Sequence, residues 1–175
     1  MQIVDGNILY IADSSNHRIV IVTPDSTNAT ATFGSFGTGV TRFKNPTDIF
    51  VTRTSIYILD ATNYRVQLWP RGGSSGTTVA GATGNLGGPS SLTNLGYSFG
   101  IFVDRNRQLY VVDTANHRVL RFPPDSIGGD ASIRVAGNVT SGSGSSQLSS
   151  PSKVFVDDVH GHVIVDKYFR RTVEL

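Results

Sequence analysis

The chain has 175 residues, of which 38% are hydrophobic and 16% charged, and its 19 glycines and 7 prolines predict a turn-rich soluble domain, neither disordered nor membrane-spanning. Its net charge of +2 is spread along the sequence, so it does not favour a nucleic-acid partner. The absence of cysteine excludes disulfides, thiol catalysis and zinc–cysteine sites.

Short runs of β-branched and aromatic residues without helical spacing predict strands along the whole chain. In order, we expect strands at 1–4, 9–12, 18–22, 31–33, 48–51, 56–59, 65–69, 77–80, 100–103, 109–112, 118–122, 132–136, 153–156, 163–165 and 171–175. Loops rich in Gly, Ser and Thr at 34–45, 81–95 and 137–150 divide the strands into four groups. We expect these loops to be flexible connections that also offer a contact surface.

One sequence motif is repeated along the chain. The segment 109–122, L-Y-V-V-D-T-A-N-H-R-V-L-R-F, recurs at 9–22 and 56–69 and in a weaker form at 162–175. The aspartates of these copies are 47, 53 and 53 residues apart, which indicates a repeat array. In D-x-x-N-x-R, the Asp and Asn predict a tight turn between antiparallel strands, and the donors of the Arg suit it to tying neighbouring turns together.

Residues repeated in every unit usually serve the unit, so we prefer a structural role for this motif over a ring of charge around a central ligand. The residues concerned are Asp13, Asn16, Arg18, Asp60, Asn63, Arg65, Asp113, Asn116, Arg118, Asp166 and Arg171. A further equivalent position, just before the first strand of the later groups, holds Pro46, Ser98 and Pro151. Because proline has no N–H to donate, we expect it to stay outside the strand ladder.

Four antiparallel strands in a unit of about 50 residues are typical of a β-propeller blade. The units resemble NHL repeats: 99–104 reads F-G-I-F-V-D, 109–122 follows L-Y-V-x-D-x-x-N-x-R-V-x-x-F, and 135–137 ends the unit with V-A-G. The first two units end similarly, with F-G at 33–34 and A-G at 80–81.

The resemblance implies an all-β propeller, usually of about six blades. We expect one domain, 1–175, with four-stranded antiparallel blades at about 1–34, 46–81, 98–137 and 151–175, the last lacking its outer strand. The chain begins within a strand, which favours an incomplete ring over a small closed ring of four blades. In the fourth unit Phe169 replaces the motif Asn and Thr172 the Val, so we expect an altered turn there.

Strand order places the D-x-x-N-x-R turns and the Gly/Ser loops on one face, and the turns at Pro24, Pro70 and Pro123 on the other. We expect binding on the first face, because its loops differ in sequence on a repeated scaffold. Tyr and Arg are common binding anchors, so Tyr64 and Arg42 are the first choices. The full set of candidates is Arg42, Lys44, Tyr64, His17, Tyr97 and His117.

Histidine positions do not predict a metal site. His17 and His117 are equivalent residues of different blades, which sit too far apart on a ring to share a metal. His160 and His162, near Asp157 and Asp158, have the spacing of a chelating pair, but they also fit a solvated turn. We expect no metal, no cofactor and no catalytic residue.

The resemblance implies a protein-interaction platform, a ligand-sensing ectodomain or an RNA reader. We expect a non-catalytic scaffold with a protein partner and no membrane insertion. The alternatives are RNA binding and a metal-dependent lyase or lactonase-like hydrolase with its site in the central channel. The apolar innermost strands, I-F-V and V-F-V, argue against a channel metal, and Arg42 with Lys44 is only a small basic pair for an RNA reader.

The compartment and the oligomeric state stay open. No basic start with an apolar run follows Met1, so we predict no signal peptide. The glycosylation sequons at Asn28 and Asn138 are about as many as chance provides, and they give only a slight preference for an extracellular over a cytoplasmic location.

Overall fold

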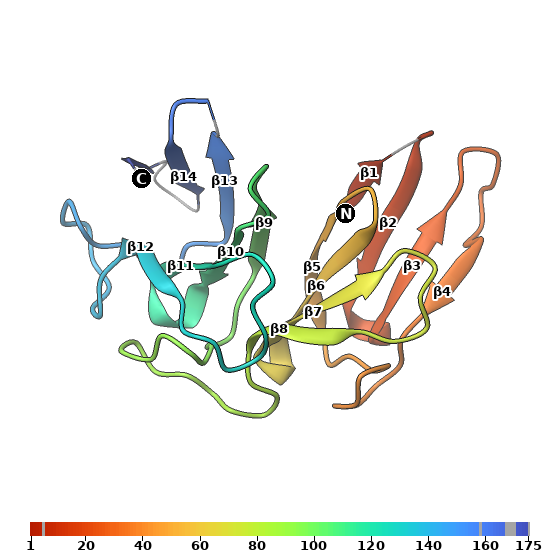
Figure 1. The fold of residues 1–175 in the computed structure, drawn as a ribbon, viewed down its shortest axis with the longest axis horizontal. Helices are drawn as coiled ribbons and strands as arrows, with labels where there is room; N and C mark the ends of the chain where they lie inside the picture. The colour runs from red at the N-terminus through yellow and green to blue at the C-terminus, as the bar shows by residue number, and fades with distance from the viewer. Residues whose placement is uncertain (5, 158, 167–170, 175) are drawn as a thin grey trace.

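The computed structural model describes residues 1–4, 6–157, 159–166 and 171–174. These residues form four antiparallel sheets, and their helices are single 3₁₀ turns. None of the described helices has the length and apolar character needed to cross a membrane. Figure 1 shows the sheets side by side in an open arc, with the first sheet at one end and the last at the other.

The first sheet contains β1 (Gln2–Val4), β2 (Ile8–Asp13), β3 (Arg18–Val22) and β4 (Ala31–Phe33). The second contains β5 (Pro46–Val51), β6 (Ser55–Asp60), β7 (Arg65–Pro70) and β8 (Thr77–Gly81). The third contains β9 (Gly100–Val103), β10 (Leu109–Asp113), β11 (Arg118–Phe122) and β12 (Ile133–Gly137). The fourth contains β13 (Lys153–Asp157), β14 (His162–Asp166) and β15 (Arg171–Glu174).

The all-β, incomplete propeller predicted from the sequence is confirmed. Consecutive strands pair within each sheet, and the fourth sheet has three strands among the described residues. The first strands of successive sheets, β1, β5, β9 and β13, contact one another, so they are the innermost strands of the arc. The strands occur where the sequence predicts them, with ends that differ by at most two residues.

The prediction that proline stays outside the ladder is wrong for Pro46. It is the first residue of β5 and lies opposite Asp60, with a bulge between Pro46 and Asp48. Proline is tolerated there because a first residue on an inner edge strand has no obligatory N–H bond to make. Pro151, in contrast, precedes β13 and takes no part in it.

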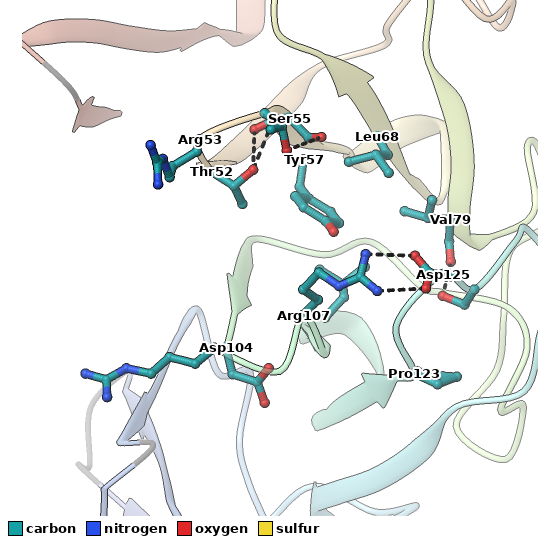
Figure 2. Close-up of a pocket in the computed structure, with 14 residues that line it drawn as sticks. Thr52, Arg53, Ser55, Tyr57, Leu68, Val79, Asp104, Arg107, Pro123 and Asp125 are labelled. Atoms are coloured by element: carbon teal, nitrogen blue, oxygen red, sulfur yellow. Dashed lines mark hydrogen bonds and ion pairs between the residues drawn. The ribbon is translucent and has the colours of Figure 1, made fainter.

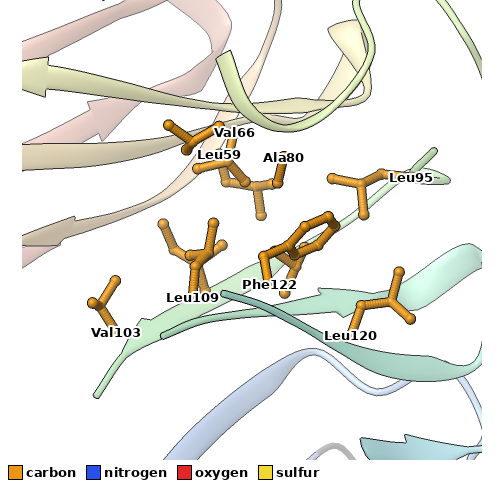
Figure 3. Close-up of a cluster of buried hydrophobic side chains, with 11 residues drawn as sticks. Leu59, Val66, Ala80, Leu95, Val103, Leu109, Leu120 and Phe122 are labelled. Atoms are coloured by element: carbon orange, nitrogen blue, oxygen red, sulfur yellow. The ribbon is translucent and has the colours of Figure 1, made fainter. Parts of the chain in front are cut away.

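The core consists of three apolar clusters, each between two neighbouring sheets. All five residues of β10 are buried. Leu109 and Val111 pack toward the second sheet, and Tyr110 and Val112 toward the fourth. Figure 3 shows the middle cluster, where Leu59 of the second sheet meets Leu109 and its neighbours of the third. Burial on both faces explains why these strands are apolar throughout instead of alternating.

The inter-blade loops are packed, which differs from the flexible connections expected. Each loop buries one apolar side chain between two sheets: Phe43, Leu95 or Leu148. The Phe43 ring lies 5.5 Å from the Trp69 ring, centroid to centroid. All three anchors stand three residues before the equivalent position of Pro46, Ser98 and Pro151.

The fourth sheet has a different register from the other three. Asp and Arg of the motif lie directly opposite each other in the first three sheets, for example Asp113 and Arg118. In the fourth, Arg171 lies opposite Val165. An altered turn was expected there, but Phe169 and the rest of the turn at 167–170 lie outside the described residues.

Gly100 permits the close approach of two innermost strands and yields the first prediction. A Cβ at Gly100 would lie 2.6 Å from the Ser152 carbonyl oxygen in the next blade. We expect Gly100→Ala to lower the free energy of unfolding by about 1–3 kcal/mol through overpacking, measured by chemical denaturation. The control is Gly88→Ala, because a Cβ there meets nothing within 4 Å. Equal stability of the two variants would contradict this packing.

Candidate functional site

The first three copies of the motif each form a tight turn between the second and third strands of their sheet. The turns contain η1 (Ser14–Asn16), η2 (Ala61–Asn63) and η3 (Thr114–Asn116). The following residues, His17, Tyr64 and His117, each have a φ of 56°. The left-handed conformation thus occurs at the residue before the Arg. Asn adopts it more readily than other residues with a side chain, but the motif Asn stands one residue earlier, where its side chain binds the Asp.

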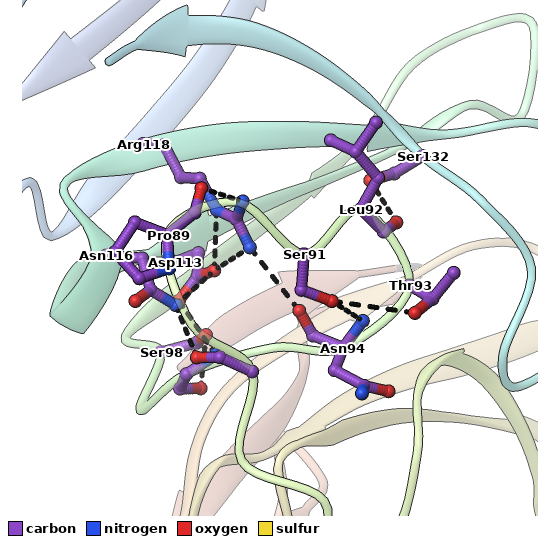
Figure 4. A network of polar contacts seen from close by, with 12 residues as sticks. Pro89, Ser91, Leu92, Thr93, Asn94, Ser98, Asp113, Asn116, Arg118 and Ser132 are labelled. Carbon is purple, nitrogen blue, oxygen red and sulfur yellow. Dashed lines mark hydrogen bonds and ion pairs between the residues drawn. The ribbon is translucent and has the colours of Figure 1, made fainter. Parts of the chain in front are cut away.

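The charged side chains of the third turn are completely buried (Figure 4). Asp113 and Arg118 are each 0% exposed, and Arg118 Nε donates to Asp113 Oδ2 at 2.9 Å. Asn116 Nδ2 donates to the same carboxylate oxygen at 2.9 Å. Two charges that are removed from water need additional hydrogen bonds to offset their lost hydration. The bonds that Asp113 receives from Arg118 and Asn116 offset part of this loss.

The same buried group holds the inter-blade loop that precedes it. The backbone N–H of Gly96 donates to Asp113 Oδ1 at 2.9 Å. Arg118 donates to the carbonyl oxygens of Pro89 at 2.6 Å and Asn94 at 3.4 Å. Figure 4 shows the Arg118 guanidinium between the carboxylate and this loop. One arginine therefore links a turn of its own blade with the loop arriving from the blade before.

The second turn repeats this arrangement. Arg65 Nε donates to Asp60 Oδ2 at 2.8 Å, and both side chains are buried. Arg65 Nη2 donates to the carbonyl oxygens of Gly39 and Arg42, each at 2.9 Å. The backbone N–H of Lys44 donates to Asp60 Oδ1 at 2.6 Å. The loop residues on either side of the Phe43 anchor are thus fixed through their backbones.

The first turn is more exposed. Arg18 and Asp13 form the same ion pair at 2.8 Å, but the Arg18 side chain is 43% exposed. Asn16 donates to Asp13 at 3.0 Å. For the fourth turn, the side chains of Asp166 and Arg171 lie outside the described part of the structure.

Burial changes the protonation behaviour of the motif carboxylates. Burial raises the pKa of Asp60 and of Asp113 above its usual value, against their hydrogen bonds and neighbouring arginines, which lower it. In the exposed first turn, the hydrogen bond from Arg18, followed by that from Asn16, lowers the pKa of Asp13. The Arg and Asn of the motif lower the pKa of the Asp in all three turns, and burial outweighs them in the second and third.

Two candidate binding residues hold the ends of loops. The backbone N–H of Asn45 donates to His17 Nδ1 at 3.1 Å, and that of Ser150 donates to His117 Nδ1 at 2.9 Å. The two histidines therefore play the same part at equivalent places in different blades. Neither faces the other.

Three candidates lie close to Phe36, a residue that the sequence analysis missed. Phe36 is 58% exposed, and its ring lies 5.0 Å from that of His17. Lys44 Nζ lies 6.0 Å from the Phe36 ring centroid, and Arg42 Nη1 donates to the Phe36 carbonyl oxygen at 3.4 Å. We call His17, Phe36, Arg42 and Lys44 the Phe36 site. The signal for it was a lone aromatic residue in the Gly-rich segment G-S-F-G.

The other candidates do not belong to the Phe36 site. Tyr64 and His117 occupy the left-handed position of the second and third turns. Tyr97 packs against the partly exposed Phe99, with ring centroids 5.2 Å apart. The six predicted residues thus fall into one cluster of three and three separate positions on the motif turns and the loop before β9.

A pocket of about 590 Å³ lies between the second and third blades, at the ends of the strands opposite the motif turns (Figure 2). It was not predicted, because binding was expected on the other face. The turns after β5, β9 and β11 form its walls. The lining residues are Thr52, Arg53, Thr54, Ser55, Tyr57, Leu68, Val79, Asp104, Arg105, Arg107, Leu109, Pro123, Asp125 and Ser126.

An exposed ion pair stands at the mouth of this pocket. Arg107 binds Asp125 with two parallel bonds, Nη1 to Oδ1 at 3.1 Å and Nη2 to Oδ2 at 2.9 Å. In Figure 2 the ring of Tyr57, from the second blade, points toward Arg107. Burial raises the pKa of Tyr57, so its phenol is neutral and a hydrogen-bond donor near pH 7.

The histidine pair of the last blade makes a local contact. His160 Nδ1 lies 2.7 Å from Asp157 Oδ2, and the His160 and His162 rings stack with centroids 6.0 Å apart. Asp158 lies outside the described residues. Among the residues that are described, no three His, Cys, Asp or Glu side chains gather in a way that could hold a metal ion.

No protein-family model and no curated protein matches the chain. Solved structures do match it. An auxiliary nutrient binding protein from Bacteroides thetaiotaomicron aligns with a TM-score of 0.63 at 14% identity, over 91% of this chain and 42% of that chain. A nidogen/laminin complex gives 0.61 at 19% identity, over 95% and 59%. A catalytically inactive virginiamycin B lyase from Staphylococcus aureus with quinupristin gives 0.60 at 11% identity, over 99% and 54%.

These neighbours are β-propeller-like proteins, and at such low identities the likeness shows the fold alone. The chain spans about half the length of the solved chains it matches, between 42% and 59%. The comparisons therefore place the chain among β-propellers without assigning it a family.

The depth of burial predicts different effects for equivalent arginines. We expect Arg118→Ala to lower the free energy of unfolding by about 3–5 kcal/mol, because it leaves the buried Asp113 carboxylate without its charged partner. The matched change Arg18→Ala, in the exposed first turn, should cost less than about 1 kcal/mol. Chemical denaturation of both variants measures the difference. Equal losses would mean that burial does not set the strength of the motif.

Proposed function

We propose that this chain is a non-catalytic binding scaffold of the NHL type, and that its Phe36 site holds an acidic, apolar-bearing segment of a partner protein. The observation that carries the proposal is a large aromatic side chain, 58% exposed, in a loop whose backbone is held by hydrogen bonds and by the buried Phe43. Exposed aromatic residues with neighbouring cations are common anchors in protein interfaces.

The backbone of the site is fixed before any partner arrives. Phe43, seven residues after Phe36, is buried, and the Arg42 carbonyl and Lys44 N–H are bonded to the second motif turn. The side chains of Arg42 and Lys44 therefore project from a backbone held at both points. Such pre-organisation lowers the entropy lost on binding.

The chemistry of the site selects the partner. Lys44 lies over the Phe36 ring and Arg42 binds the Phe36 carbonyl oxygen, and no carboxylate of the described residues is paired with either cation. A positive rim favours an acidic segment, and the ring favours an apolar side chain within that segment.

The repeat motif supports the NHL assignment, because its Asp, Asn and Arg make the same contacts in the first three blades. A metal-dependent lyase is the weaker alternative, although one solved neighbour is a lyase. The innermost strands line up Phe50, Phe102 and Phe155, with successive ring centroids 5.1 and 5.3 Å apart. A row of aromatic rings offers no metal ligands. Another solved neighbour, the nidogen/laminin complex, is in line with a protein partner.

The test is a selection of random peptides displayed on phage against the immobilised protein. We expect selected peptides to carry Asp or Glu next to an aromatic or aliphatic residue. Their binding should fall at least about tenfold in the variant Phe36→Ser with Arg42→Glu and Lys44→Glu, since removed anchors typically cost about 2 kcal/mol or more.

The control variant is Arg53→Glu, on the opposite face. It should leave peptide binding unchanged, and circular dichroism should show both variants folded. Peptides that bind the triple variant as well as the wild type, or that lose binding in the control, would place the partner site elsewhere.

A further inference from the structure

Three equivalent tyrosines, on the second strands of the first three blades, differ in how they are covered. Tyr10 is 5% exposed and lies beneath Arg71, whose guanidinium carbon is 5.9 Å from the ring centroid. Tyr110 is fully buried, and its hydroxyl donates to Asp104 at 3.3 Å. Tyr57 is only half-buried, and its hydroxyl has no protein partner among the described residues.

The difference has a simple cause in the sequence. The turn after the third strand reads W-P-R at 69–71 in the second blade and F-P-P at 122–124 in the third. Pro124 is therefore equivalent to Arg71, which covers Tyr10 of the preceding blade. Proline has no long side chain to reach across to Tyr57. The space that Arg71 fills between the first two blades is therefore open between the second and third, as the pocket of about 590 Å³.

The interior and the mouth of the pocket differ in character. Leu68, Val79 and Leu109 supply apolar surface, with the Tyr57 ring beside them. The mouth carries Arg53, Arg105 and Arg107 against Asp104 and Asp125. Its volume is that of small-ligand pockets, and it combines an apolar interior with a polar mouth.

The mouth keeps hydrogen-bond donors that a ligand can use. Asp125 is already paired with Arg107, and Asp104 accepts from the Gln108 N–H at 2.7 Å and from the Tyr110 hydroxyl. Arg107 uses two of its five N–H donors for Asp125, so further donors stay available to a second carboxylate.

Arg107 stands in the turn between the first two strands of the third blade. Arg107 has a φ of 62°, a conformation uncommon for residues with a side chain. In the fourth blade, the turn between the first two strands uses Gly161 at a φ of 69° instead.

We propose that this pocket binds a small carboxylate with an apolar body. The body lies against Tyr57, Leu68 and Leu109, and the carboxylate receives hydrogen bonds from Arg107 and the Tyr57 hydroxyl. The site is separate from the Phe36 site and does not depend on the proposed scaffold function.

Three probes with one apolar body separate the contributions of shape and charge: phenylpropionate, phenylpropanol and phenylpropylamine. Binding is followed by amide NMR titration of the isotope-labelled protein. We expect phenylpropionate to bind with a Kd of the order of millimolar, as suits a ligand of this size, and about tenfold or more tighter than the alcohol. The amides of Tyr57, Leu109 and Asp125 should shift.

Two variants test the residues. Arg107→Asn suits the left-handed backbone, so it should not lower stability, yet it should weaken phenylpropionate binding about tenfold. Pro124→Arg should place an arginine over Tyr57 and reduce binding of all three probes. The matched control is Arg134→Gln, an exposed arginine of β12 outside the pocket, which should change nothing.

Several outcomes would overturn the proposal. These are equal or tighter binding of the alcohol or the amine, no binding of any probe, amide shifts confined to other residues, or full affinity in Arg107→Asn. Unchanged binding after Phe36→Ser is expected, because that residue belongs to the other site.

Discussion

The buried ion pair between the motif Asp and Arg is the interaction on which the rest of the structure depends. Asp113 and Arg118 have no exposed surface, so each needs every bond it makes. Those bonds reach the backbone of the preceding loop, and the second motif turn does the same for 34–45. The motif thereby converts Gly-rich segments without regular structure into fixed parts of the fold.

Residues that repeat from blade to blade stabilise the fold, and residues that differ between blades form the two proposed binding sites. The repeated residues pack the sheets and hold the loops. Two places where the blades differ are Phe36, in a loop on the motif face, and Pro124, where the second blade instead has Arg71. At the first place the Phe36 ring is exposed near a cation, and at the second no arginine covers Tyr57. Variation at such positions alters a surface while the core stays the same.

The sequence predicted the strands, the turns and the propeller because four copies of one pattern report the same structure. The loops were interpreted less well, since Phe43, Leu95 and Leu148 are single apolar residues within Gly- and Ser-rich segments, and only alignment of the repeats reveals them. The pocket was beyond sequence reasoning because it depends on which side chain of one blade covers a tyrosine of another. Nor could the roles of His17 and His117 be read from the sequence, since their partners are backbone N–H groups of distant loops.

The most direct test of the central claim is amide hydrogen exchange in Arg65→Lys, which keeps the charge beside Asp60 but loses the fork that reaches two loop carbonyls. We predict faster exchange at Phe43 and Lys44, whose N–H groups bind Ser35 and Asp60. The amides of Gly87 and Gly96, which bind Leu95 and Asp113 in the next loop and the third motif turn, should keep their protection. Unchanged exchange at Phe43 and Lys44 in a folded variant would contradict the claim that the arginine holds the loop.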